Sequence, residues 1–242
     1  MPITTLTLFG FARPTDQRWA FLQMGLARPA LLFRRGLRFW KLLGCGRGSS
    51  FTLDVDWGRY GLLAVWDSLT DADEFFASRP FRAYQHHADE IWTVKLIPLT
   101  THGAWSGQRP FTPVKYTPRV GSPIAVLTRA TLRLRHLRRF WEQVPAATHD
   151  LNAAPGLLAS IGLSELPILQ AATFSLWSDE TAMRAFAYGT PHHREVVRRT
   201  YHENWYAESL FTRFYPLASS GTWNGRDPLG DVHAVSASAT TF

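Results

Sequence analysis

The stretch "GAWSGQRPF", residues 103–111, has a second copy in "GTWNGRDPL", residues 221–229. The correspondence continues upstream in the same register, so that Glu90 falls on Glu208. The other matched positions are Pro98, Leu99, Gly103, Trp105, Gly107 and Pro110 in the first copy, and Pro216, Leu217, Gly221, Trp223, Gly225 and Pro228 in the second. An internal repeat of this kind indicates a duplicated folding unit. The fold is therefore expected to consist of two related halves.

Two further phrases recur with different offsets, which indicates that the loops of the two halves differ in length. They are "AVWDSLTDADEFF" (64–76) with "SLWSDETAMRAFA" (175–187), and "LRFW" (37–40) with "LRRFW" (137–141). We expect an N-terminal repeat with its linker over residues 1–119 and a C-terminal repeat over 120–229. Residues 230–242 are small and polar and are predicted to form a flexible tail.

Length and composition are typical of a globular protein. The chain has 242 residues, 45% hydrophobic and 14% aromatic, enough to bury a substantial core. No run of 18 apolar residues occurs, so no membrane-spanning helix is expected. The N-terminus has neither a charged region before its apolar part nor a cleavage signal, which favours a cytoplasmic location. Cys45 is the single cysteine, so an internal disulfide is excluded.

The formal net charge of +7 comes mainly from arginine and includes two basic clusters, residues 34–41 and 133–139. Such clusters either form a solvated helix face or bind an anionic partner: nucleic acid, a membrane surface or an acidic protein. The sequence contains no zinc-finger spacing, no aromatic RNA-binding motif and no helix-turn-helix pattern, so no nucleic acid is expected as a partner.

Each half has a readable order of elements. The first half is predicted as a strand over 3–12, an Arg-rich helix to about 43, a break over 44–50, a strand over 60–67, a helical region over 68–90 and a strand over 92–100. The second half is predicted as a strand over 123–132, a helix over 135–149, strands near 157–163 and 170–178, a helix over 179–201 and a strand over 208–217.

A β-α-β-β-α-β order is the ferredoxin-like unit. Two such units in tandem can pack their antiparallel sheets face to face. The expected fold class is therefore α+β, with tandem ferredoxin-like repeats that form a pseudo-dimeric α/β barrel. The repeated Trp/Gly phrase is interpreted as a strap by which the last strand of each half leaves the sheet.

One position distinguishes the halves. When "SRPFRAYQ" (78–85) is aligned with "GTPHHREV" (189–196), Pro80 falls on Pro191 and Phe81 falls on His192. A site built once in a pseudo-symmetric pair requires such a difference, and histidine is the commonest proximal ligand of haem iron. A surface or capping histidine is the alternative interpretation.

Other chemical signals are weaker. "GCGRG" (44–48) lacks the strand-to-helix context of a phosphate loop and is interpreted as a turn. The adjacent histidines of "HHADE" (86–90) would point about 100° apart on a helix, which disfavours one shared metal ion. No dinucleotide fingerprint is present, so electrons for any redox reaction would come from a partner protein.

Several phrases together resemble the spheroidene monooxygenase family of carotenoid-oxidising haem enzymes, over about residues 1–229. They are "GAWSGQRPF", "ADEIWTVKLIPL" (88–99), "TRATLRLRHLRRFWEQVP" (128–145), "TFSLWSDETAMRAFA" (173–187) and "TWNGRDPL" (222–229). The resemblance implies a haem b-dependent oxygenase that introduces a keto group into an acyclic carotenoid, using O2 and electrons from a ferredoxin. The family's Pro-His phrase matches Pro191 and His192, which implies that His192 binds the haem iron, with His193 as the substitute.

Under this resemblance a hydrogen-bond donor on the distal side of the haem is also required. Arg129 is our choice, with Arg82 and Arg226 behind it, and each could equally be a surface arginine. An apolar substrate pocket is expected to include Trp66, Phe174 and Trp177, which could equally be core residues. The basic stretch 34–41 is a candidate for peripheral contact with anionic lipid.

Two rival classes remain. The first is a haem enzyme of another reaction class, a dehydratase or an enzyme of nitrogen-containing substrates, because function resides in the site rather than in the fold. The second is a non-catalytic binder of haem or of an apolar molecule. The second histidine of "PHHREVV" and the cysteine of "LLGCGRGSSF" depart from the family's usual sequence and bear on the ligand assignment and the pocket chemistry.

Overall fold

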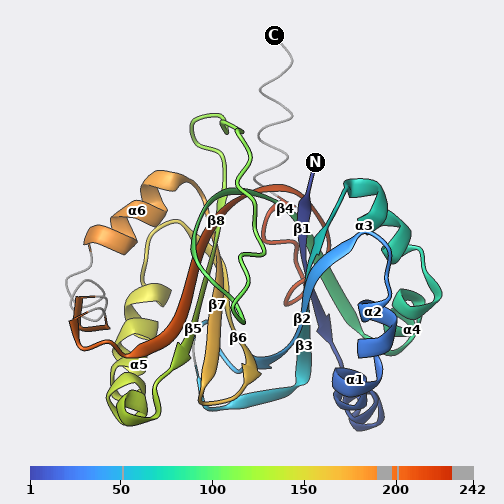
Figure 1. The fold of residues 1–242 in the computed structure, drawn as a ribbon, viewed down its shortest axis with the longest axis horizontal. Helices are drawn as coiled ribbons and strands as arrows, with labels where there is room; N and C mark the ends of the chain where they lie inside the picture. The colour runs from blue at the N-terminus through green and yellow to red at the C-terminus, as the bar shows by residue number, and fades with distance from the viewer. Residues whose placement is uncertain (51, 190–197, 201, 231–242) are drawn as a thin grey trace.

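The computed structural model describes residues 1–50, 52–189, 198–200 and 202–230 (Figure 1). The candidate ligands His192 and His193 and nearly all of the predicted C-terminal tail lie outside the described residues.

Each half contributes four strands to one sheet. The elements of the first half are β1 (Ile3–Gly10), α1 (Pro14–Leu26), α2 (Arg28–Leu32), β2 (Leu37–Gly46), β3 (Val55–Trp66), α3 (Leu69–Phe76), α4 (Arg79–His87) and β4 (Glu90–Gly103). Those of the second half are β5 (Ile124–Leu132), the 3-10 turn η1 (Leu134–His136), α5 (Leu137–Asn152), β6 (Leu157–Leu166), β7 (Gln170–Trp177), α6 (Glu180–Gly189) and β8 (Tyr206–Gly221).

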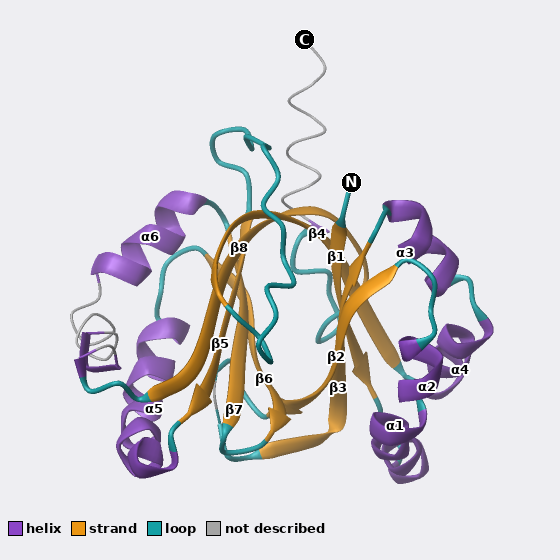
Figure 2. Cartoon of the chain, in the orientation of Figure 1, coloured by secondary structure: helices purple, strands orange, loops and turns teal. Residues whose placement is uncertain are grey.

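The described strands close into a barrel in the order β1-β3-β2-β6-β7-β5-β8-β4. Within each half the strands follow the ferredoxin-like order, and the halves meet where β4 pairs with β8 and where β2 pairs with β6. The helices of each half cover the outside of its own sheet, so the strands lie between two helical layers (Figure 2). The predicted fold class is confirmed. No helix among the described residues has the length and apolar character needed to cross a bilayer.

Two adjacent predictions are wrong. The Arg-rich helical stretch expected to run to about residue 43 ends at Leu32, and residues 37–46 form β2. Residues 44–46, predicted to lie in a break and a turn, are therefore part of this strand. Gly36, at φ +75°, turns the chain between α2 and β2. Phe39 and Leu43 then face the barrel interior while Leu42 faces the helices, the two-residue alternation of a strand. Consequently "LRFW" lies on a strand and "LRRFW" begins α5, so these two phrases are not structural equivalents.

The repeated straps fill the barrel. Trp105 and Phe111 from the first copy, and Trp223 and Leu229 from the second, belong to the same buried cluster as the inward side chains of the strands. The rings of Trp92 and Trp223 lie 5.2 Å apart, centroid to centroid. Gly103, Gly107, Gly221 and Gly225 all have positive φ, as expected for tight turns. The interpretation of these phrases as straps is confirmed.

The two straps are bound reciprocally by glutamates at the starts of the last strands. Glu208, near the start of β8, accepts hydrogen bonds from the backbone amides of Ser106 (2.8 Å) and Gly107 (2.7 Å). Glu90, at the start of β4, accepts one from the amide of Gly225 (2.7 Å). Because β4 and β8 are antiparallel, the strap that leaves one strand lies beside the first residues of the other. Each half therefore holds the strap of its partner half.

The two glutamates differ in their counter-charges. Glu208 pairs with Arg129, whose side chain is 2% exposed, whereas Glu90 lies 3.7 Å from the half-buried Arg59. Burial alone would raise the pKa of Glu208, but the amides of Gly107 and Ser106 and the Arg129 charge together lower it below its usual 4.5. The ionised form of Glu208 is therefore favoured in the folded protein.

We predict that Glu208→Gln lowers the free energy of unfolding by about 3 kcal/mol at pH 7, because Arg129 is left buried without a carboxylate. Glu90→Gln is the matched control, and its effect should be clearly smaller. A group with a depressed folded pKa stabilises above its unfolded pKa and loses that contribution as the pH falls through its folded pKa. The difference between wild type and Glu208→Gln in urea unfolding should therefore shrink below pH 4.5. Equal losses in the two variants would contradict the assignment.

We also predict that Gly103→Ala is much more disruptive than Gly107→Ala. Both glycines have positive φ, which costs about 1–2 kcal/mol for alanine. A Cβ at Gly103 would in addition lie 2.0 Å from the Ser209 carbonyl oxygen, whereas nothing lies within 4 Å of a Cβ at Gly107. The extra clash should cost about 1–3 kcal/mol more, measured by thermal and denaturant unfolding. Similar costs at both positions would show that the strap can move away from β8.

Candidate functional site

The two halves can be compared position by position on the faces that the helices cover. In the first half Ile3 pairs with Trp66, and in the second half Ile124 pairs with Trp177 in the same register. The pairing of β2 with β3 and of β6 with β7 extends this correspondence across both sheets. A difference in size between equivalent side chains therefore changes how much of the volume between the sheet and the helices is filled.

Large side chains in the first half are replaced by small ones in the second. Phe9, Trp40, Leu42, Tyr60 and Leu62 correspond to Ala130, Ser160, Gly162, Ala171 and Thr173. We call the latter five residues the small-residue face. The larger side chains of the first half belong, with its helices, to one continuous buried cluster. Among the described residues, the second half has no large side chains in a buried cluster over this set of positions.

The apolar packing of the second half is divided into two clusters. One contains Ile124, Val126, Leu151, Trp177 and Met183, and joins the sheet to α6 and the end of α5. The other contains Leu132, Phe140 and Trp205, at the beginning of α5. The small-residue face lies between them along the strands. A flat surface of small side chains allows close approach of a planar group to the backbone.

Several buried polar atoms gather on this side of the barrel without a hydrogen-bond partner among the described residues. They include the hydroxyl oxygens of Thr148 and Thr173 and the indole nitrogen of Trp141. Trp141 lines a small cleft of about 40 Å³ together with Gly162 and Ala171. Burying such groups unpaired costs free energy, so they are suited to contact with a bound molecule.

The edge of this region is formed by β8. Phe211, opposite Thr128 in the register, is 37% exposed. Arg213 follows two residues later, donates to the Thr100 hydroxyl (3.0 Å) and pairs with Glu180 of α6 (2.8 Å). The region therefore offers an apolar ring and a positive charge beside the small-residue face.

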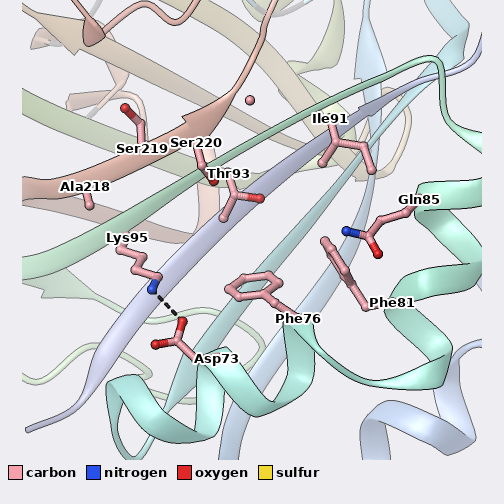
Figure 3. A pocket seen from close by; sticks show the side chains of 11 residues that line it. Asp73, Phe76, Phe81, Gln85, Ile91, Thr93, Lys95, Ala218, Ser219 and Ser220 are labelled. Carbon is pink, nitrogen blue, oxygen red and sulfur yellow. Dashed lines mark hydrogen bonds and ion pairs between the residues drawn. The ribbon is translucent and has the colours of Figure 1, made fainter.

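The first half shows a cleft at the corresponding place. It has a volume of about 450 Å³ and lies between α3 and α4 and the strands β4 and β8 (Figure 3). Lys95 and Asp73 form an ion pair at one end (2.5 Å), and Phe76, Phe81 and Gln85 form the helix side. Phe81 is the residue that aligns with His192. The architecture thus leaves a cleft between helices and sheet, lined at this position by an apolar ring in the first half.

Comparison with known proteins places this arrangement in a family. The chain is 34% identical over 231 residues to spheroidene monooxygenase of Rhodobacter capsulatus, covering 95% of this chain and 96% of that protein. It is 36% identical over 234 residues to spheroidene monooxygenase of Cereibacter sphaeroides, covering 96% of this chain and 72% of that protein. The chain belongs to the spheroidene monooxygenase family. No general protein-family profile matches it.

Solved structures resemble this member of the spheroidene monooxygenase family in fold only. A crystal structure of aldoxime dehydratase aligns with a TM-score of 0.60 and 9% identity, covering 89% of this chain and 81% of that one. At such low identity the similarity shows the shared barrel of tandem repeats and carries no inference about the reaction.

The structure places the three predicted arginines in three different environments. Arg129 is buried on the inward face of β5, between the strands and the ring of Trp105, with its guanidinium 5.6 Å from that ring. It therefore faces away from the small-residue face and from α6. Arg82 is exposed on α4, and Arg226 is exposed in the second strap. The structure does not bring these residues together, and the role of a distal donor stays a prediction.

The three predicted pocket residues also belong to separate clusters. Trp66 packs under the first-half helices and donates to the Thr5 hydroxyl (2.9 Å). Trp177 packs under α6, and Phe174 lies inside the barrel. The structure does not bring these three residues together, and their role in substrate binding stays a prediction.

Cys45 lies inside the barrel, and burial raises its thiol pKa far above the usual value, which disfavours a thiolate ligand. Among the described residues, no group of three or more histidine, cysteine, aspartate or glutamate side chains is placed to hold a metal ion. Sequence reasoning missed the small-residue face. The signal was available in the alternation of small residues over 159–175, compared position by position with 39–64.

We predict that Thr173→Val has little effect on stability, because the buried hydroxyl of Thr173 has no partner among the described residues. Thr212→Val is the matched control: Thr212 is fully buried in the same sheet, and its hydroxyl bonds that of Thr101 (2.8 Å). The control should lose about 1–2 kcal/mol in urea unfolding. A comparable loss for Thr173→Val would show that this hydroxyl is bonded within the protein itself.

Proposed function

We propose that the protein is a monooxygenase that introduces a keto group into an acyclic carotenoid or a similar long apolar substrate. The observation that carries the proposal is the identity of 34–36% with two spheroidene monooxygenases over nearly the whole chain. Both straps and both helical layers fall within the aligned part, because the match covers 95–96% of this chain.

We further propose haem b as the cofactor, which the small-residue face would hold, with His192 as the residue that would bind the iron and His193 as the alternative. The described residues fit a flat, largely apolar group of this kind. The small side chains permit close approach, the ring of Phe211 offers an apolar edge, and the unpartnered hydroxyl of Thr173 offers a polar contact. When bound, haem supplies an iron centre that activates O2.

The chain's own residues have separate tasks in this proposal. Arg213 provides a positive charge at the β8 edge, suited to a haem propionate, and Glu180 and Thr100 hold its guanidinium in place. The clusters on either side of the face exclude water from it and fix the spacing between sheet and helices. Electrons would come from an external carrier such as a ferredoxin, because the sequence has no dinucleotide-binding fingerprint.

The test is the visible absorption spectrum of the protein purified with haem supplied, for wild type, His192→Ala and His193→Ala. We expect a Soret band in wild type that is lost or shifted in His192→Ala, because the axial ligand sets the electronic state of the iron. His86→Ala is the matched control: His86 lies on α4 of the first half, away from the small-residue face, and should leave the spectrum unchanged.

The same preparations should be assayed with a detergent-dissolved acyclic carotenoid, O2 and a reduced ferredoxin. Wild type should form a keto product, and His192→Ala should form at least about a hundredfold less, as expected when a catalytic group is lost. A wild-type protein that binds no haem, or a His192→Ala spectrum identical to wild type, would refute the ligand assignment. Turnover in the absence of O2 would refute the oxygenase reaction.

A further inference from the structure

The outer surface of the first helices is unusually apolar for a protein surface. Seven large apolar side chains are each more than half exposed on α1, on α2 and the residue after it, on the β2–β3 connection and at the start of β3: Phe21, Leu22, Leu26, Leu32, Phe33, Leu53 and Trp57. We call these seven residues the apolar ridge. Phe33 alone is 84% exposed. Exposed apolar surface of this extent marks an interaction site rather than ordinary surface.

The members of the ridge lie together in space. Leu22 and Leu26 are one turn apart on α1, and α2 begins at Arg28, two residues after α1 ends. The rings of Phe21 and Trp57 lie 5.8 Å apart, which joins α1 to the start of β3. Both helices belong to the helical layer of the first half, remote from the second half (Figure 1). The opposite side of α1 packs on the sheet through Ala20, so this helix is apolar both toward the core and toward solvent.

The charges around the ridge are mainly basic, with Asp54 and Asp56 beside Leu53 and Trp57 as the acidic exceptions. Residues 17–53 contain no aspartate or glutamate, but seven basic residues: Arg18, Arg28, Arg34, Arg35, Arg38, Lys41 and Arg47. Arg18, Arg28 and Arg35 are exposed and form no ion pair with the described residues. Basic residues interspersed with leucine, phenylalanine and tryptophan are the composition of helices that lie in a membrane interface.

We infer that the apolar ridge docks the protein on the surface of an anionic lipid bilayer. This rests on the proposed function, because a carotenoid substrate is dissolved in membrane. In the docked state α1 and α2 lie in the interface, with Leu26 and Phe33 among the acyl chains and Arg28 and Arg35 against anionic headgroups. The ridge fits a bilayer better than an acidic protein, because the exposed aromatic and aliphatic side chains lie on several separate segments and are accompanied by exposed arginines.

The inference is tested by flotation of the wild-type protein with phosphatidylcholine vesicles with and without phosphatidylglycerol. Wild type should bind the anionic vesicles at low salt, and should bind the neutral ones at least about tenfold more weakly. Leu26→Ser and Phe33→Ser should each weaken binding about tenfold, the effect of withdrawing one large apolar side chain from lipid. Both side chains are exposed, so the fold should be unaffected.

Leu134→Ser and Tyr188→Ser are the matched controls, because these side chains are equally exposed, at 74% and 69%, but lie on the second half. They should leave flotation unchanged. Equal binding to neutral and anionic vesicles, or equal losses in ridge and control variants, would overturn the inference. The inference would also be overturned if wild type did not float and sedimentation showed a wild-type dimer that Phe33→Ser dissociates. The ridge would then bind a second copy of the chain.

A second readout separates this inference from the proposed function. Leu26→Ser and Phe33→Ser should retain wild-type turnover of a detergent-dissolved carotenoid while losing turnover of the same carotenoid supplied in anionic vesicles. Loss of turnover in both conditions would overturn the inference, because the ridge would then act in the reaction rather than in docking. Absence of any carotenoid turnover by wild type, with vesicle binding intact, would refute the proposed function alone.

Discussion

The structure depends on the pairing of β4 with β8 and on the carboxylates that bind a strap at each end of it. The pairing runs from Trp92–Gly221 to Gly103–Leu210, whereas β2 and β6 meet only at Gly44–Ser164 and Cys45–Leu163. Glu90 and Glu208 hold the straps by accepting backbone hydrogen bonds, which in turn place Trp105 and Trp223 inside the barrel. Without this closure each four-stranded sheet would expose its inner apolar face to water.

The closed barrel allows its two outer faces to diverge. Side chains of both halves fill the barrel interior. The side chains between the sheet and the helices can therefore differ between the halves without disrupting the packing inside the barrel. The first half uses this freedom to pack large side chains into one cluster, and the second half presents small side chains between two clusters. Large side chains under the helices of one half, and small side chains at the equivalent described positions of the other, are the physical basis of the proposed haem site.

The sequence predicted the architecture because the repeated residues are ones that the fold requires. Glycines with positive φ and buried tryptophans recur at equivalent places, and Trp66 and Trp177 end equivalent strands. The sequence misled at β2, where Arg34, Arg35 and Arg38 suggested a solvated helix although Phe39 and Leu43 point into the barrel. The arginines indicate exposure to solvent, but the segment forms a strand because Phe39 and Leu43 pack inside the barrel. A local sequence pattern does not contain this tertiary information.

The candidate site was predictable only in part. The substitution of His192 for Phe81 is visible in an alignment of the two halves, but the small-residue face emerges only when strand registers fix which residues share a face. Arg129 illustrates the same limit, since strand alternation by itself leaves open whether it faces the helices or the barrel interior, and the structure places it inside beside Glu208.

The central claim, that one half alone is built to hold the cofactor, is tested most directly by the stoichiometry of haem per chain in the reconstituted wild-type protein. The pyridine haemochrome assay, set against protein concentration from amino-acid analysis, should give one haem per chain. A value near zero would show that the small-residue face holds no haem. A value near two would show that the first half, with Phe81 at the position of His192, binds haem as well, and would contradict the asymmetry on which the account rests.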